Sequence, residues 1–340
     1  MQTLTKYSRG ARLLLAGAAL ALSSATASAS GKQTLCVWDI IGAQGDVFNM
    51  MKDYKLAAAK WGANIDLRPY TDEKIASEDF KAGQCDAVVM TGLRGRQFNT
   101  FTGSIDSLGS LPSYAMLQKA LATLSSPAAS KLMVSGNYEV AGIAPMGAAY
   151  LFVNDRLINT VGKLSGKKIA VLDYDKAQAK MVQQVGAQPV ASDVTNFAGK
   201  FNNGSVDIVG SPAAGFKPLE LHKGLGTRGA IVNFPLLQLS IQVIVRRDKF
   251  PEGFGQKSRE YMQAQYPRAM SLISKAEADI EKKYWMQIPA ADQEKYIIMM
   301  RESRIALTNE GIYDKRMMSV LKKVRCQVEP SNAECAQKLE

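Results

Sequence analysis

The sequence predicts an α/β protein with two similar lobes, followed by a helical C-terminal region. Strand-like and helix-like segments alternate in both halves of the chain, which is typical of parallel sheets with crossover helices. Two short stretches also repeat one pattern, FKAGQCDAVV at Phe80 to Val89 and FNNGSVDIVG at Phe201 to Gly210. Each reads Phe, two residues, Gly, two residues, Asp, one residue and Val.

The first 29 residues have the three parts of a secretory signal peptide. A basic start is followed by the apolar run Leu13 to Leu22 and by Ala27-Ser28-Ala29, a small-x-small cleavage site. The apolar run is about half the length of a membrane span. We therefore expect a mature chain that begins near Ser30 and is exported to the periplasm of a Gram-negative bacterium.

The first half of the mature chain reads β-α-β-α-β. Apolar residues recur at helical spacing after Asp46, a suitable N-cap, and short β-rich runs lie on either side. Successive parallel strands of this kind require right-handed crossovers. The expected elements are the strand TLCVWDII, a helix from Val47 to Trp61, the strand ANIDLRPY, a helix from Lys74 to Lys81, and the strand CDAVVMTG.

The second half repeats this order, and the repeated stretches explain why. In each copy the Phe packs the last turn of a helix onto the sheet, the Gly ends that helix with positive φ, and the Asp opens the next strand. Two copies of one unit predict two lobes. The expected elements are the strand KKIAVLDYD, a helix from Lys176 to Val185, the strand AQPVAS, a helix from Val194 to Asn202, and the strand VDIVGSP.

The remaining segments connect the lobes and cover them. The long uncharged run GAIVNFPLLQLSIQVIV predicts a strand that crosses between lobes, and helices follow over Gln256 to Ala264, Ser271 to Trp285 and beyond. The crossing segments Val140 to Asn154 and Asn233 to Arg246 would carry a hinge. We expect lobe 1 over 30–140 plus about 240–257, lobe 2 over 141–239, and a helical region over 258–340 that spans both lobes.

Charge and composition exclude several function classes. The net charge is +11, and removal of the three basic residues before position 30 leaves +8. The basic residues are dispersed, without the clustered stripe that nucleic-acid binding requires, so we expect no nucleic-acid partner. No Gly-x-Ser-x-Gly, P-loop or His-Glu-x-x-His motif occurs, and the single histidine, His222, has no neighbouring ligand set. We therefore expect neither an enzyme nor a bound metal or cofactor.

Four cysteines in an exported chain favour two disulfides. Four cysteines allow three connectivities. Cys326 and Cys335 are close in the C-terminal tail and suggest a local loop, which leaves Cys36 to pair with Cys85. That second bond would tie the first strand to the start of the third.

Several motifs resemble the periplasmic substrate-binding proteins of TRAP transporters, the DctP-like family. The similarity is carried by GAAYLFVNDRLINTVGKLSGKKIAV, by VGAQPVASDVTNFAGKFNNGSVDIV and by WMQIPAADQEKYIIMMRES. KQTLCVWDIIG, SEDFKAGQCDAVVMTGLRGRQFN and GSIDSLGSL are similar to the AdeT-type solute-binding proteins, a group described in connection with RND-type multidrug efflux. The resemblance implies a two-lobed periplasmic binding protein fold of type II, with long C-terminal helices packed across both lobes.

One departure from the DctP-like pattern concerns ligand charge. In that family, the strand equivalent to Lys168-Ile169-Ala170-Val171 carries an arginine that pairs with the ligand carboxylate. Here the matching residue is Ala170. The resemblance therefore leaves the usual mode of carboxylate binding without its main side chain.

Candidate ligand contacts follow from the rule that ligands lie outside the carboxyl ends of parallel strands. Arg94 and Arg96 could replace the missing arginine, aided by helix N-terminal amides at Gly45 to Val47, and this predicts an acidic solute. Alternatively, aspartates at strand ends predict a cationic solute such as a polyamine or aminoglycoside, with cation-π contacts from aromatic residues. The candidates are Trp38, Asp39, Asp46, Thr91, Arg94, Arg96, Asp173, Tyr174, Asp175, Ser211 and Phe216.

The functional expectation is a solute-binding protein that captures a small molecule between its lobes by hinge closure. A closed, loaded form would then deliver the solute to an inner-membrane transporter. The alternative is a periplasmic accessory protein of an RND-type efflux system, whose partners would be efflux-pump proteins. Each residue nominated above also has an ordinary structural role, as a helix cap, a turn residue or a salt-bridge partner.

Overall fold

A computed structural model describes residues 31–337 and 339 of the chain. The predicted signal peptide lies outside the described residues. Within the described part, no helix is both long and apolar enough to span a membrane.

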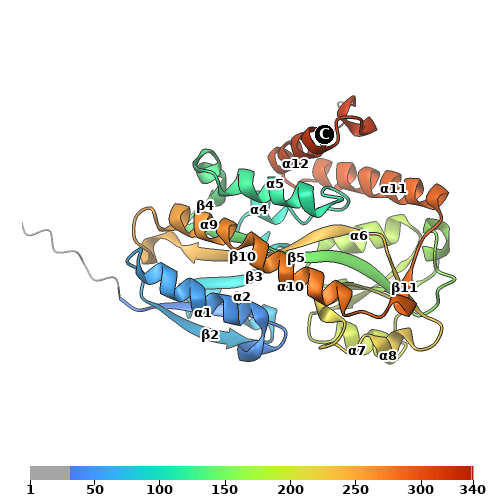
Figure 1. Cartoon of the computed structure of the whole chain (residues 1–340), viewed down its shortest axis with the longest axis horizontal. Coiled ribbons are helices and arrows are strands. Elements are labelled where there is room, and N and C mark those ends of the chain that lie inside the picture. Colours follow the sequence, from blue (N-terminus) through green and yellow to red (C-terminus); the bar gives the residue numbers. More distant parts are fainter. Residues whose placement is uncertain (1–30, 338, 340) are drawn as a thin grey trace, which may run out of the picture.

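The first lobe is built on the parallel strands β2-β1-β3 (Figure 1). Helix α1 buries one face, formed by Phe48, Met51, Tyr54 and Ala58, against this sheet. Helix α2 begins at its N-cap Asp72, whose carboxylate accepts the amides of two residues in the first turn. The elements are β1 (Gln33–Trp38), α1 (Asp46–Ala59), β2 (Ile65–Tyr70), α2 (Glu73–Lys81) and β3 (Ala87–Thr91).

The second lobe repeats this plan with the parallel strands β8-β6-β7. Asp175 caps helix α6 by accepting the amide of Ala177 at 3.0 Å. The elements are β6 (Lys168–Leu172), α6 (Lys176–Gln184), β7 (Gln188–Ser192), α7 (Phe197–Asn202) and β8 (Ile208–Pro212). The five expected elements are therefore present in each lobe, with boundaries that differ by a few residues.

The repeated stretches have the same structure in both lobes. Phe80 and Phe201 are fully buried at the ends of α2 and α7. Gly83 and Gly204 follow with φ of 78° and 76°, a left-handed conformation that favours glycine. Each glycine therefore ends a helix and turns the chain toward the next strand, as expected.

The repeated aspartate has a further role that the pattern did not predict. The Asp86 carboxylate accepts the amide of Thr34 at 2.9 Å, and the Asp207 carboxylate accepts the amide of Lys168 at 2.9 Å. The amides of the two aspartates donate in return to the carbonyls of the same partners. Each aspartate thus fixes the register between the first and third strands of its lobe.

Two long antiparallel strands join the lobes into one sheet, β5 (Tyr138–Val153) and β10 (Leu237–Arg246). β10 pairs with β3 of the first lobe, whereas the second half of β5 pairs with β8 of the second, which gives the order β2-β1-β3-β10-β5-β8-β6-β7. The register shifts near the middle of β5, where Gly147 has a φ of 105°. This bulge lies just before Ala149, where β5 begins to pair with β8.

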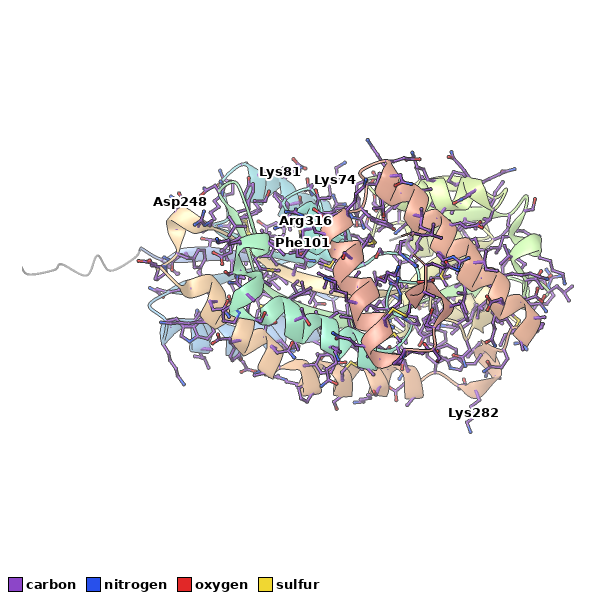
Figure 2. All side chains as sticks on the ribbon, turned by 90° about the horizontal axis from the view of Figure 1, so that it is seen from above. Lys74, Lys81, Phe101, Asp248, Lys282 and Arg316 are labelled. Carbon is purple, nitrogen blue, oxygen red and sulfur yellow. A yellow bond between two sulfur atoms is a disulfide. The ribbon has the colours of Figure 1, made fainter. Side chains whose placement is uncertain are left out.

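The C-terminal helices pack across both lobes, as expected. Helix α11 contacts α6 of the second lobe, and α12 contacts α4 and α5 beside the first lobe (Figure 1). Seen from above, α12 places Arg316 over the ring of Phe101 at 5.6 Å (Figure 2). The helices are α4 (Thr100–Gly103), α5 (Tyr114–Ser125), α9 (Phe254–Ala264), α10 (Tyr266–Ala278), α11 (Ala290–Asn309) and α12 (Lys315–Val328).

The expected helix from Ser271 to Trp285 is wrong at both ends. Helix α10 starts five residues earlier, with Pro267 in its first turn, and stops at Ala278. Trp285 lies in a short strand, with its ring edge-on to Tyr150 at 5.0 Å. The single strand expected over GAIVNFPLLQLSIQVIV is interrupted at Pro235, and its first part forms the separate short strand β9 (Ala230–Val232). Other short elements are α3 (Gly92–Gly95), β4 (Val134–Ser135), α8 (His222–Leu225) and β11 (Trp285–Met286).

Both expected disulfides are present. Cys36–Cys85 joins β1 to the start of β3, with both side chains completely buried. Cys326–Cys335 closes the C-terminal tail onto α12. No free cysteine remains among the described residues.

Candidate solute-binding site

A cavity of about 350 Å³ lies between the lobes, near the carboxyl ends of β1, β6 and β8. The two crossing strands form part of its wall, and helices α1 and α10 supply further residues. Small-molecule sites in two-lobed α/β proteins are found at this position. The wall is largely aliphatic, with Leu, Ile, Val, Met and Ala side chains from both lobes.

The carboxylate of Asp39, at the end of β1, is held by backbone amides. Oδ2 accepts from Val47 and Phe48 at 2.9 and 3.1 Å, and Oδ1 accepts from Ile41 at 2.9 Å. Gly45 lies so close that a Cβ there would overlap the carboxylate. Asp39 therefore fills the N-terminus of α1 from within the protein, and of the amides proposed for ligand capture, those of Gly45 and Val47 are already occupied.

Five other candidates from the sequence line the cavity, namely Trp38, Asp46, Thr91, Tyr174 and Ser211. Thr91 caps the short helix α3 by accepting the amide of Arg94 at 3.2 Å. The Ser211 hydroxyl donates to the carbonyl of Pro212 at 3.1 Å. The indole Nε1 of Trp38 is buried and has no hydrogen-bond partner among the described residues.

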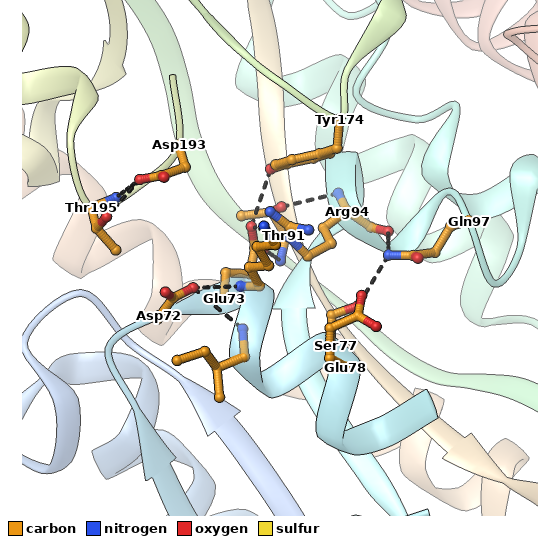
Figure 3. Close-up of polar contacts among 12 residues, drawn as sticks. Asp72, Glu73, Ser77, Glu78, Thr91, Arg94, Gln97, Tyr174, Asp193 and Thr195 are labelled. Carbon is orange, nitrogen blue, oxygen red and sulfur yellow. Dashed lines mark hydrogen bonds and ion pairs between the residues drawn. The ribbon is translucent and has the colours of Figure 1, made fainter. Parts of the chain in front are cut away.

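Arg94 lies beside this cavity, in an internal ion pair (Figure 3). Its Nε donates to Oε2 of Glu73 at 3.1 Å, and both side chains are buried. The Tyr174 hydroxyl donates to the same Glu73 oxygen at 3.1 Å, while the Arg94 guanidinium lies 3.7 Å from the Tyr174 ring centroid. Glu73 and Arg94 belong to the first lobe and Tyr174 to the second, so this contact crosses the cleft.

Arg96 makes a second contact across the cleft. Its Nη1 donates to Oδ1 of Asp175 at 3.0 Å, and its Nε donates to the carbonyl of Gly103 at 3.1 Å. Burial opposes the charge of Arg96, but Asp175 and neighbouring groups outweigh it and raise the pKa of the guanidinium. We call the set Glu73, Arg94, Arg96, Tyr174 and Asp175 the cross-lobe latch.

Burial and the Glu73 carboxylate keep the latch tyrosine protonated. Desolvation raises the pKa of Tyr174 well above its ordinary value, and the nearby negative charge of Glu73 raises it further. The hydroxyl therefore remains a donor to Glu73 at any physiological pH.

A buried acid lies beside Arg96, on the segment between α4 and α5. Asp106 is almost fully buried, and desolvation raises its pKa to about 7, with Ser240 and Arg96 partly offsetting this effect. Neither carboxyl oxygen has a hydrogen bond of good geometry within the described structure.

The remaining candidates lie away from the cavity wall. Asp173 is exposed and lines a second pocket, of about 540 Å³ and more open to solvent, that Arg94 and Arg96 also line. Phe216 packs in an aromatic cluster with Phe152 and Tyr284, at ring distances of 6.3 and 5.3 Å. In the described part of the chain, no three His, Cys, Asp or Glu side chains are arranged to hold a metal ion.

Glu73 and the apolar wall were missed by sequence reasoning. Glu73 follows an Asp at the start of a helix, where an acid is ordinarily a solvated first-turn residue. Its burial depends on Arg94 and Tyr174, which lie 21 and 101 residues away in the chain. The pattern around Glu73 contains no signal of this contact.

Two α/β lobes, two shared crossing strands and a cavity at the strand ends define a solute-binding protein of the periplasmic type. Two solved TRAP periplasmic solute-binding proteins have this fold. One, from Desulfovibrio salexigens, has a TM-score of 0.74 and 16% identity, over 87% of this chain and 99% of that one. Another, from Ralstonia eutropha H16, has a TM-score of 0.72 and 12% identity over the same shares.

The chain belongs to the family of the solute-binding proteins AdeT 1/2, whose sequence model matches residues 55–340. It is 55% identical over 300 residues to "Probable solute-binding protein AdeT1" of Acinetobacter baumannii, covering 88% of this chain and 99% of that protein. It is 28% identical over 233 residues to "Probable solute-binding protein AdeT2" of the same organism, covering 68% of this chain and 98% of that protein. This membership confirms the predicted resemblance to AdeT-type proteins. It also places the chain in a family of solute-binding proteins and not of enzymes, as expected.

The solved structures of the same fold were obtained with small organic acids. The Desulfovibrio salexigens protein holds orotic acid and the Ralstonia eutropha protein holds (S)-2-acetolactate. A third, from Chromohalobacter salexigens, holds D-glucuronate, with a TM-score of 0.70 and 12% identity over 86% of this chain and 99% of that one.

Proposed function

We propose that this protein is a periplasmic receptor that captures one small molecule between its lobes and delivers it to a membrane transporter. The cavity between the lobes supports this most strongly, because residues of both lobes line it at the strand ends. A ligand that contacts both lobes stabilises their closed arrangement in proportion to its preference for that arrangement.

Hinge closure would occur at the crossing strands. We assign lobe 1 to 30–140 with about 240–257, lobe 2 to 141–239, and the helical region to 258–340. The bulge near Gly147 supports a hinge at this point, since a register shift interrupts regular pairing between β5 and β10. The cross-lobe latch lies beside the cavity and would hold the closed form.

Delivery requires export, and the first 29 residues would supply it as a cleavable signal peptide of a Gram-negative bacterium. N-terminal sequencing of the secreted protein tests this directly. We expect the mature chain to begin near Ser30. A mature protein that retains its first residues would contradict release into the periplasm.

The sequence led to two opposite predictions of the charge of the solute, acidic or cationic. Arg94 and Arg96 are engaged with Glu73 and Asp175, and Asp39 is engaged with backbone amides. Both arginines nominated for an acidic solute thus have partners within the protein, as do Asp39 and Asp175 of the aspartates nominated for a polyamine or aminoglycoside, whereas Asp46 and Asp173 are exposed. Binding of either charged class in the way first expected would require these pairs to separate.

A ligand screen by thermal shift tests the receptor function. The mature chain is heated with organic acids, amino acids, polyamines, aminoglycosides and uncharged apolar compounds at fixed salt. A ligand at 100 times its Kd adds about 2.7 kcal/mol of stability, which a melting curve resolves. We expect a saturable shift with one class, which is lost when Ala170→Trp fills the cavity. A wild-type chain without a saturable shift for any class would contradict the proposal.

The alternative is an accessory protein of an RND-type efflux system. It predicts co-purification of inner-membrane pump components with the periplasmic protein and no saturable small-molecule site. The cavity wall favours the receptor, so we place the accessory second. Affinity purification after cross-linking in cells separates the two, because a receptor would capture transporter subunits only when loaded.

A further inference from the structure

The described residues that line the inter-lobe cavity include no basic side chain. Among the described residues that line it, the only charged ones are Asp39 and Asp46. Asp39 is satisfied by three backbone amides, and Asp46 is exposed at the first turn of α1. An anion would therefore enter an aliphatic cavity without a cationic partner, and such desolvation is strongly unfavourable.

The apolar part of the wall is extensive and adaptable. Leucine, isoleucine and valine come from both lobes, and Ile41 adds a half-exposed apolar side chain. Five methionines, Met50, Met51, Met146, Met181 and Met262, line the same space. Methionine is unbranched and polarizable, so it adjusts to apolar ligands of different shape.

Trp38, which lines the cavity, has a buried polar atom without a partner among the described residues. The indole Nε1 of Trp38 donates to no described residue, although the side chain is 97% buried, with 3% exposed. Indole Nε1 is a donor only, so its natural complement is a carbonyl, ether or hydroxyl oxygen. A buried donor without an acceptor is unfavourable, and a ligand oxygen would remove that cost.

From these observations we infer that the cavity takes an uncharged, largely apolar solute that offers one hydrogen-bond acceptor to Trp38. The inference rests on the proposed receptor function and names its ligand class. This ligand class differs from the organic acids held by the structural neighbours, because the described part of the wall offers no cation to a carboxylate.

The test uses three probes that share the naphthalene ring system, and the mature chain without other ligands. They are 2-acetylnaphthalene, 2-naphthoate and 2-(aminomethyl)naphthalene, whose substituents at position 2 are a neutral acceptor, an anion and a cation, respectively. Titration calorimetry should give saturable one-to-one binding of the ketone. We expect the anion and the cation to bind at least about tenfold more weakly, because each must leave water without a partner charge.

The variant Trp38→Phe tests the polar contact separately. It keeps the ring and removes the donor, so the affinity for 2-acetylnaphthalene should fall about fivefold to tenfold. The affinity for 2-ethylnaphthalene, which has no acceptor, should be unchanged. A purely structural role of Trp38 would change both affinities equally. Leu56→Gln, on the exposed face of α1, serves as the matched control and should leave both unchanged.

The failures of the two proposals are distinguishable through further titrations with orotate and D-glucuronate. Saturable binding of these acids or of 2-naphthoate, with the ketone at least tenfold weaker, would overturn the apolar inference and leave the receptor function standing. No saturable binding of any probe or acid would overturn both. If Trp38→Phe lowers the affinities for 2-acetylnaphthalene and 2-ethylnaphthalene equally, the proposed hydrogen bond to the indole donor is wrong.

Discussion

The cross-lobe latch predicts that one amide substitution opens the protein. In Asp175→Asn, the side chain still accepts the amide of Ala177, so the cap of α6 is retained, but the charge that faces Arg96 is lost. The ion pair spans the cleft with an N to O distance of 3.0 Å, and the two side chains are 12% and 2% exposed.

The expected magnitude follows from this burial. Removal of one partner from a buried ion pair costs about 3–5 kcal/mol, because the other charge stays buried without compensation. Asparagine retains a hydrogen-bond acceptor, so we expect about 2 kcal/mol against the closed form. Since about 1.4 kcal/mol corresponds to a tenfold change, the ratio of closed to open molecules should fall about thirtyfold. A protein closed about ten to one would become open about three to one.

Small-angle scattering measures this change as a larger radius of gyration, and titration measures it as a weaker apparent affinity for whichever ligand binds. Asp173→Asn is the matched control, because this neighbouring carboxylate is exposed and forms no ion pair with a described residue. An unchanged radius in Asp175→Asn, or an equal increase in Asp173→Asn, would refute the latch.

Three further outcomes concern stability. The Glu334 carboxylate contacts the buried guanidinium groups of Arg304 and Arg325 at 3.0 and 2.9 Å. Glu334→Gln should therefore lower the free energy of unfolding, measured by urea titration, by about 3 kcal/mol. A loss below about 1 kcal/mol would contradict this role. The Cys36–Cys85 disulfide closes a sequence separation of 49, and the Cys326–Cys335 disulfide closes one of 9. Removing the first should lower the free energy of unfolding by about 4 kcal/mol, and removing the second by about 2.5 kcal/mol. The reverse order would contradict the dependence on loop length. The pKa of Asp106 is raised from 3.8 to about 7 in the folded protein, so the folded state keeps a proton that the unfolded state loses. The free energy of unfolding should therefore decrease as pH rises from 4 to about 7, by up to about 4 kcal/mol. Asp106→Asn should abolish this pH dependence, and an identical dependence in the variant would contradict the argument.

Much of the fold could be predicted from local sequence signals. The Gly of the repeated stretch acts on its own helix end, so the local spacing alone indicated a helix end followed by a strand, whereas the contact of the Asp with the first strand of its lobe could not be read from the pattern. The two uncharged runs that contain β5 and β10 were recognisable because strands buried on both faces have no polar alternation, although the second run is divided into β9 and β10. Helix α10 was misplaced because apolar spacing extends to Trp285, whereas pairing with β9 turns that residue into a strand.

The site was less accessible to sequence reasoning because it depends on distant pairings. Arg94 and Arg96 lie among glycines at a strand end, which is also what an anion-binding loop looks like. Whether they face a ligand or a protein carboxylate is decided by Glu73 and Asp175, in other elements. The apolar character of the cavity likewise arises from single side chains on many elements, none of which forms a motif.

Titration of the mature chain and of Ala170→Trp with 2-acetylnaphthalene tests solute capture between the lobes most directly. Ala170 lines the cavity, and the indole would fill it while leaving the exposed surface of the lobes unchanged. We expect one-to-one binding to the wild-type chain and no measurable binding to the variant, with both proteins folded by circular dichroism. Equal binding to both proteins would place the ligand outside the cavity and contradict capture between the lobes.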